Sequence, residues 1–319
     1  MNIDYLRVSV TGRCNLKCIY CHPPGDQDMA ECGEFLSLKE IRRVVKLFAQ
    51  CGIKKVRLTG GEPLLRDNIL GLVRELSSID AVEELSVTTN GVHLESLAAG
   101  LKAAGLNRVN ISLDSFNRSS YEKITGFDLL PDVIRGIYKA IEVGLMPVKI
   151  NCVVIKDVND SSDEITALAR MSVNLPVIVR FVEYYPTNRN SVLTKEYVPS
   201  IDVRKIIENE FGRLDDISVS AGYGPAVNFR IKNSAGGIGF ISGRSSMFCG
   251  QCNRLRLTSD GKIKPCLYSS AQYDLKELLS NGSGDEEILR LLEKIIREKS
   301  RYTKLNSPLE EFSMQSIGG

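Results

Sequence analysis

Six of the nine cysteines in this 319-residue chain are gathered in two groups of three. The first group is Cys14, Cys18 and Cys21, spaced C-x3-C-x2-C, and the second is Cys249, Cys252 and Cys266, spaced C-x2-C-x13-C. Cysteines clustered in this way indicate metal binding where the surroundings keep thiols reduced. The other three, Cys32, Cys51 and Cys152, are scattered, and we predict that they are buried as small apolar side chains.

Three neighbouring thiolates are compatible with zinc, a redox couple or an iron–sulfur cluster. Structural zinc takes four ligands, and His22 could supply the fourth beside the first group. A redox C-x2-C pair normally begins a helix in a thioredoxin-like setting, which is absent here. A four-iron cluster held by three cysteines leaves one iron open to a substrate or cofactor. Zinc binding remains an alternative for the second group, because C-x2-C beside a hairpin is typical of zinc ribbons.

Composition excludes several classes of protein. The 41 Lys and Arg residues nearly balance the 39 Asp and Glu residues, so there is no overall basic footprint for nucleic acid. No apolar stretch approaches the roughly 18 residues of a membrane span, and the first residues do not resemble a signal peptide. We therefore expect a cytoplasmic protein that binds neither nucleic acid nor membrane.

The first two-thirds of the chain alternates β-rich runs with amphipathic helical stretches. The predicted strands are 6–11, 55–60, 84–89, 108–114, 148–155 and 177–184, and helical patterns include 38–50, 94–104 and 132–144. Such alternation predicts βαβ units and a parallel sheet. Each strand has one polar face, which a filled barrel would not have. We therefore predict an α/β fold, an incomplete (β/α)6 TIM-like barrel around a wet interior.

After about residue 220 the pattern becomes glycine-rich and hairpin-like, with a "DG" turn at 260–261 and helical patterns at 272–280 and 285–299. We expect a barrel over 1–220 and a C-terminal α+β extension over 221–319 that covers the barrel mouth. The polar strand faces carry the cations Arg7, Lys55, Arg57, Lys149 and Arg180. Buried cations need an anionic partner, and a polyphosphate would serve. No P-loop motif occurs in the sequence.

The first cysteine group follows the first predicted strand, and an aromatic residue precedes its last cysteine. This pattern resembles the signature of the radical S-adenosylmethionine (SAM) superfamily, whose glycine-rich contact to the methionine moiety is matched by "TGGEP" at 59–63. The stretch "FCGQCNRLRLTSDGKIKPCL" resembles the GTP 3′,8-cyclase family of molybdenum cofactor biosynthesis. That resemblance runs from "LRVSVTGRCNLKCIYC" through "TTNG", "NISLDS" and "VKINCVV" to the terminal "IGG".

The resemblance implies a lyase that converts GTP to 3′,8-cyclo-7,8-dihydro-GTP with two [4Fe-4S] clusters and SAM. An adenosyl radical would take hydrogen from ribose C3′, and the resulting carbon radical would attack guanine C8. Each cysteine group would hold one cluster. The implied SAM contacts are Tyr20, Gly60, Gly61, Glu62, Ser112 and Tyr185. The implied GTP contacts are Arg7, Lys55, Arg57, Thr88, Lys149, Arg180, Arg254, Leu255 and Arg256.

The tail residues Gly318 and Gly319 are expected to reach the active site, as in the family. The chain departs from the family pattern in three places. Tyr185 and His22 both stand where methionine is common, and "KSRYTKLN" at 299–306 replaces a usual Lys-Pro and His-bearing pattern. The expected partners are GTP, an electron donor and the next enzyme of the pathway, in a monomer or homodimer. Two alternatives remain: another two-cluster radical SAM enzyme with a peptide or other substrate, and a non-catalytic iron–sulfur or zinc sensor.

Overall fold

The computed structural model describes residues 3–21, 35–185, 197–217, 225–246, 249–303 and 317. Its central strands are β1 (Tyr5–Ser9), β2 (Lys55–Thr59), β3 (Glu84–Thr89), β4 (Arg108–Ser112), β5 (Val148–Val154) and β6 (Val177–Glu183). The helical elements between and after them are α1 (Leu38–Gln50), η2 (Pro63–Leu65), α2 (Ile69–Ser77), α3 (Leu94–Ala103), α4 (Arg118–Thr125), α5 (Leu130–Glu142), α6 (Ser162–Asn174) and α7 (Ser200–Phe211). The six predicted strands and the three predicted helices are confirmed, with bounds that differ by two residues at most.

The C-terminal region contributes further strands and short helices. They are β7 (Asp215–Asp216), β8 (Val227–Arg230), β9 (Gly237–Ile241), η3 (Cys249–Gln251), β10 (Arg254–Leu257), β11 (Lys262–Lys264), β12 (Tyr273–Asp274), α8 (Lys276–Ser280), α9 (Asp285–Glu298) and η4 (Lys299–Arg301). The hairpin predicted at the "DG" turn joins β10 to β11, and Gly261 adopts a φ of +87° there. The helical pattern predicted over 272–280 is only partly right, because its start forms strand β12.

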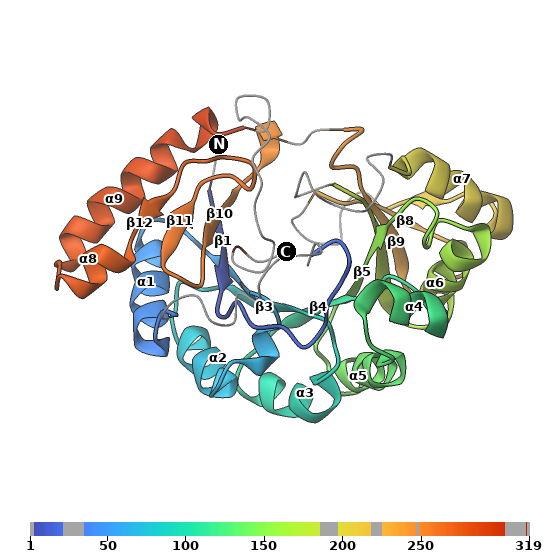
Figure 1. The fold of residues 1–319 in the computed structure, drawn as a ribbon, viewed down its shortest axis with the longest axis horizontal. Helices are drawn as coiled ribbons and strands as arrows, with labels where there is room; N and C mark the ends of the chain where they lie inside the picture. The colour runs from blue at the N-terminus through green and yellow to red at the C-terminus, as the bar shows by residue number, and fades with distance from the viewer. Residues whose placement is uncertain are drawn as a thin grey trace.

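All twelve strands lie in one sheet, in the order β12-β11-β10-β1-β2-β3-β4-β5-β6-β9-β8-β7. Strands β1 to β6 are parallel neighbours, and the sheet curves around an open interior with helices on its outer side (Figure 1). The incomplete barrel is therefore confirmed. The C-terminal region continues the sheet at both edges, since β10 pairs parallel with β1 and β9 pairs parallel with β6. Local sequence patterns gave no sign of this pairing.

The apolar core lies between the outer face of the sheet and the surrounding helices. Leu6 and Val8 of β1 point into this core and are fully buried, whereas Arg7 and Ser9 lie on the opposite face. Helix α1 begins with a capping box formed by Ser37 and Glu40. The curved sheet thus keeps its polar face for the interior.

Of the scattered cysteines, Cys152 is buried in the core as predicted, and Cys51 is half-buried against it. Cys32 lies outside the described residues. No helix in the described part of the chain is long and apolar enough to cross a membrane.

Candidate functional site

A cavity of about 350 Å³ lies inside the curve of the sheet, at the carboxyl ends of the central strands. The predicted site residues that line it are Arg7, Cys14, Cys18, Tyr20, Cys21, Arg57, Gly60, Gly61, Thr88, Ser112, Arg180, Tyr185, Arg254 and Arg256. Parallel α/β barrels carry their chemistry at this end of the strands, because loops from several strands converge there. The structure therefore brings together most of the residues that the sequence pointed to.

The loop after β1 presents the first cysteine group to this cavity. Two backbone hydrogen bonds fix the loop to the end of helix α4, from the amide of Lys17 to Thr125 O at 2.9 Å and from that of Ile19 to Ile124 O at 3.0 Å. Burial raises the pKa of Cys14 to about 11. The thiols of this group thus need a nearby positive charge to become thiolates at neutral pH.

The donor set fits an iron–sulfur cluster better than a single metal ion. No three His, Cys, Asp or Glu side chains in the described part of the chain lie close enough together to hold one ion. A polynuclear cluster, in contrast, separates its protein ligands around a larger body and is held by cysteine thiolates. The fourth zinc ligand that the sequence offered, His22, lies outside the described residues.

Gly60 and Gly61 let the loop after β2 lie directly against the start of the cysteine loop. A Cβ atom on Gly60 would come within 2.3 Å of Thr11 O, and one on Gly61 within 2.2 Å of Arg13 O. The amide of Gly61 donates to Thr11 O at 2.8 Å, which closes the contact. These glycines are therefore required by the protein's own backbone, as well as lining the cavity.

Glu62 ties two of the cavity loops together. Its carboxylate accepts hydrogen bonds from the hydroxyl of Thr89 at 2.7 Å, the amide of Asn90 at 2.7 Å and the amide of Leu64 at 3.0 Å. It is only 1% exposed and is not among the cavity-lining residues, and burial raises its pKa to about 7. The Glu62 carboxylate thus holds loops in place, and a SAM contact through its side chain stays a prediction that the cavity lining does not favour.

Asn90 extends this connection to the first cysteine group, and the sequence analysis missed it. Its side-chain amide donates to Asn15 Oδ1 at 2.7 Å, and it also forms a hydrogen bond with Cys14. The only signal for it was its place in "TTNG", directly after the third strand.

Tyr20 is held against Asp114 at the side of the cavity. Its hydroxyl donates to Asp114 Oδ2 at 2.6 Å, while Asp114 Oδ1 accepts the amide of Val153 at 2.8 Å. Burial raises the pKa of Asp114 to about 6, and these two hydrogen bonds oppose that shift. Tyr20 thus has a fixed orientation next to Cys18 and Cys21.

Five arginines line the cavity, and the wall also contains unpartnered polar atoms. The arginines are Arg7, Arg57, Arg180, Arg254 and Arg256. Four buried polar atoms on this wall have no hydrogen-bond partner within the described residues: Arg7 Nε, Arg180 Nε, Thr88 Oγ1 and Asn151 Oδ1. Burial, with Arg256 and Arg57 nearby, lowers the pKa of Arg7 well below its usual range. A buried donor without a partner is costly, so this wall fits a polar, anionic ligand.

Lys55 and Lys149 share the polar face of the sheet but do not line the cavity. Lys55 pairs with Asp4 at 2.8 Å near the amino end of β2. Lys149 is 4% exposed, and burial together with Arg108 and Arg180 lowers its pKa to about 7. A direct GTP contact by either lysine is therefore not what the geometry of this cavity favours.

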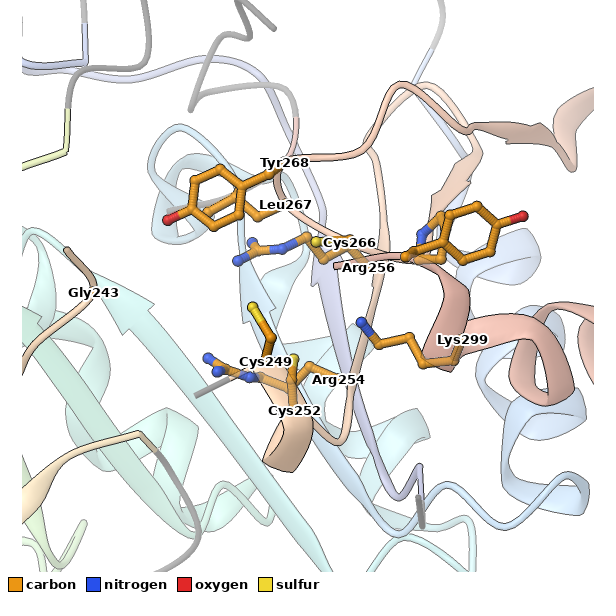
Figure 2. A pocket seen from close by; sticks show the side chains of 11 residues that line it. Gly243, Cys249, Cys252, Arg254, Arg256, Cys266, Leu267, Tyr268 and Lys299 are labelled. Carbon is orange, nitrogen blue, oxygen red and sulfur yellow. The ribbon is translucent and has the colours of Figure 1, made fainter. Parts of the chain in front are cut away.

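The second cysteine group lines a smaller pocket of about 90 Å³ (Figure 2). Cys249 and Cys252 come from and just after η3, whereas Cys266 follows β11. Although burial opposes it, the nearby charges of Arg254 and Lys299 lower the pKa of Cys252. Lys299, which the sequence analysis missed, lines this pocket too.

The small pocket and the large cavity adjoin. They share the lining residues Gly243, Arg254, Arg256, Leu267 and Tyr268. At this junction the rings of Tyr185 and Tyr268 meet edge to face, with centroids 4.9 Å apart. The two cysteine groups therefore open on one continuous space with arginines between them.

Two further expectations concern Leu255 and the tail. The Leu255 side chain is fully buried in the apolar core, on the face of β10 opposite to its two neighbouring arginines, so a GTP contact at this position, which stays a prediction, would involve its backbone. Gly318 and Gly319 lie outside the described residues. Ile317 just before them is buried, and its carbonyl accepts a hydrogen bond from Arg256 Nη1 at 3.4 Å.

Known proteins resemble this chain over its whole length. Residues 8–169 match the family described as "Radical SAM superfamily", and residues 177–305 match "Molybdenum Cofactor Synthesis C". The GTP 3′,8-cyclase of Desulforamulus reducens is 42% identical over 320 residues, which cover 100% of this chain and 98% of that protein. The GTP 3′,8-cyclase of Pelotomaculum thermopropionicum is 43% identical, over 99% of this chain and 98% of that protein.

Solved structures share the fold at low sequence identity. Streptococcus suis SuiB bound to S-adenosylmethionine superposes with a TM-score of 0.66 at 17% identity, over 89% of this chain and 66% of SuiB. The structure of SuiB alone superposes with a TM-score of 0.65 at 16% identity, over 95% of this chain and 68% of SuiB. Identities this low demonstrate a common fold and nothing finer.

Proposed function

This chain belongs to the GTP 3′,8-cyclase family of the radical SAM superfamily, and we propose on that basis that it converts GTP to 3′,8-cyclo-7,8-dihydro-GTP, the first step of molybdenum cofactor biosynthesis. The observation that carries this function is the pairing of two cysteine groups across one cavity with five arginines on its wall. A metal sensor does not need a cavity lined by arginines. The phosphates of a nucleoside triphosphate would supply the anionic partner for these arginines.

Two [4Fe-4S] clusters and SAM complete the site. Each group of three cysteines holds one cluster, and SAM binds among Tyr20, Gly60, Gly61, Ser112 and Tyr185, which line the cavity beside the first group. When bound, the first cluster and SAM supply the one-electron chemistry that removes a hydrogen atom from the ribose. The reaction also needs an external electron donor, which is one partner that we propose.

The arginines bind and orient the nucleotide. Arg7 and Arg180 each have a buried Nε without a hydrogen-bond partner within the described residues, so phosphate oxygens would satisfy both. Guanidinium groups suit this task because their donors bind phosphate in pairs. Thr88 Oγ1 and Asn151 Oδ1 offer one donor and one acceptor to the rest of the nucleotide.

The protein's remaining task is to hold two positions of one nucleotide close together and keep water away. Side chains on the rigid strands of a sheet provide this orientation without further ordering. Leu267 and Tyr268 of the C-terminal region line the same space. Their side chains shield the reacting nucleotide from solvent.

The test is anaerobic turnover with each nucleoside triphosphate in turn, in the presence of SAM and a strong reductant. The proposed function predicts about eight irons per chain, together with 5′-deoxyadenosine release that GTP stimulates far more than ATP. It also predicts an altered purine product from GTP alone. Equal stimulation by all nucleotides, or zinc in place of iron, would contradict the proposal.

A further inference from the structure

Lys299 is a buried cation at the second cysteine pocket. Its side chain lines this pocket and points into the space that Cys249, Cys252 and Cys266 surround (Figure 2). The residue is only 2% exposed. Lysine is rarely buried to this extent unless an anion lies beside it.

The fold places Lys299 there through helix α9. Ile288, Leu292 and Ile295 form the buried face of this helix, and Lys299 continues the same spacing at its C-terminal end. Arg43 of α1 anchors the start of the helix by donating to Ser283 O at 2.7 Å and pairing with Asp285 at 2.7 Å. Lys299 therefore places an ammonium group at a position where the helical spacing predicts an apolar side chain.

No carboxylate lines this pocket among the residues that the structure describes. Its charged and ionisable side chains are three cations, three thiols and two tyrosines, namely Arg254, Arg256, Lys299, Cys249, Cys252, Cys266, Tyr268 and Tyr302. Among the described residues, the negative charge beside these cations therefore comes from the thiolates and from what they bind.

Lys299 differs from the two arginines in its position. Arg254 and Arg256 line both the pocket and the large cavity, whereas Lys299 lines the pocket alone. It approaches the cysteines from the side of α9, away from the cavity that we assign to GTP. Its charge thus acts on the cysteine site rather than on the nucleotide.

We propose that Lys299 is a charge-balancing residue for the second cluster, whose ammonium group stabilises the reduced, more negative form. This inference rests on the proposed function, because it needs a cluster at this cysteine group. Hydrogen bonding and charge around the sulfurs are the means by which proteins set the reduction potentials of such clusters.

The experiment compares Lys299→Met with Lys299→Arg and with the control Lys294→Met, which changes an exposed lysine of the preceding helix α9. Each variant is reconstituted anaerobically, its iron is counted, and both clusters are titrated by electron paramagnetic resonance without substrate. Lys299→Met should shift the reduction equilibrium of the second cluster about tenfold toward the oxidised form, which is ~59 mV for one electron. Lys299→Arg should shift it less, and the first cluster should not change.

The outcomes separate this inference from the proposed function. An unchanged potential in Lys299→Met with about eight irons bound would overturn the role of Lys299 alone. Loss of the second cluster in both Lys299 variants would also overturn it, because packing and not charge would then be what matters. Loss in Lys299→Met with retention in Lys299→Arg would support it. A wild-type protein that binds iron only at the first group would overturn the proposed function as well.

Discussion

Glu183 and Ser245 are joined by two hydrogen bonds at the end of strand β6. The Ser245 hydroxyl donates to Glu183 Oε1 at 2.5 Å, and the Ser245 amide donates to Oε2 at 2.9 Å. The same carboxylate accepts the amides of Ser200 and Arg244, both at 2.9 Å. Although burial opposes them, these bonds lower the pKa of Glu183. One carboxylate therefore joins the cavity wall to the segment that leads to Cys249.

Replacing Glu183 by Gln should loosen this segment, because an amide offers one acceptor oxygen where the carboxylate offers two. We expect the free energy of unfolding to fall by about 1–3 kcal/mol and iron to be lost from the second cysteine group before the first. Denaturant unfolding and iron analysis measure the two effects. The exposed Glu210→Gln is the control. Equal iron loss from both groups would contradict a local role.

The stabilising contribution of Glu183 should also depend on pH. Because its folded-state pKa lies below the unfolded value, the contribution is complete at neutral pH and declines as the pH falls through the lowered pKa. The difference in stability between wild type and Glu183→Gln should therefore shrink on acidification.

Arg7→Met should raise the stability of the free protein and weaken its binding of GTP. The Arg7 guanidinium is buried, and its Nε has no partner in the described part of the chain, so its removal should stabilise the free protein by about 1–3 kcal/mol. GTP binding should weaken about 10- to 100-fold, as expected when a charge-assisted hydrogen bond is lost. Thermal unfolding and anaerobic calorimetry measure the two quantities. Arg42→Met, at an exposed surface pair, should change neither. Unaltered GTP affinity would remove Arg7 from the nucleotide site.

Gly61→Ala should separate the loop after β2 from the cysteine loop. The added Cβ would lie 2.2 Å from the backbone oxygen of Arg13, which cannot move away freely. The free energy of unfolding should fall by about 1–3 kcal/mol or more, and SAM affinity should fall with it. Gly243→Ala is the matched control for stability, because no atom of another described part of the chain lies within 4 Å of its added Cβ. Full stability of Gly61→Ala would show that the two loops are not in fixed contact.

The difference in stability between wild type and Lys149→Met should change with pH in the alkaline range. Burial, with Arg108 and Arg180 nearby, lowers its pKa from 10.5 to about 7. Between these values the unfolded chain holds a proton that the folded protein lacks, so folding becomes more favourable as the pH rises from about 7 to about 10. Wild type should gain stability relative to Lys149→Met over this range, by a few kcal/mol in order of magnitude. A constant difference would contradict the lowered pKa.

The period-two alternation of the strands correctly predicted which residues lie on the polar face. It could not predict which of these residues lie close enough to the carboxyl end of a strand to line the cavity. Arg57 and Lys55 share one face of β2, yet only Arg57 lies far enough toward the carboxyl end to reach the cavity. In β5, Asn151 lines the cavity while Lys149, two positions earlier, does not. The same alternation, applied to "RLRL", would have placed Leu255 on the core side.

Contacts between distant segments were beyond the reach of local patterns. The pairing of β10 with β1 joins residues about 250 positions apart, and no periodicity encodes it. The carboxylate of Glu62 is another case, because the motif that contains it suggested a ligand contact while the fold uses it between loops. Lys299 did leave a signal, a lysine at an apolar position of a helical repeat.

The pairing of the C-terminal strands with both edges of the barrel affects how the chain is made. When β1 to β6 have left the ribosome, β10 and β9 have not yet been synthesised, and both outer strands are open edges of a parallel sheet. Unpaired edges are templates for association with other chains. In the folded protein the last third therefore covers both edges of the barrel sheet, which would otherwise be open to pairing with other chains.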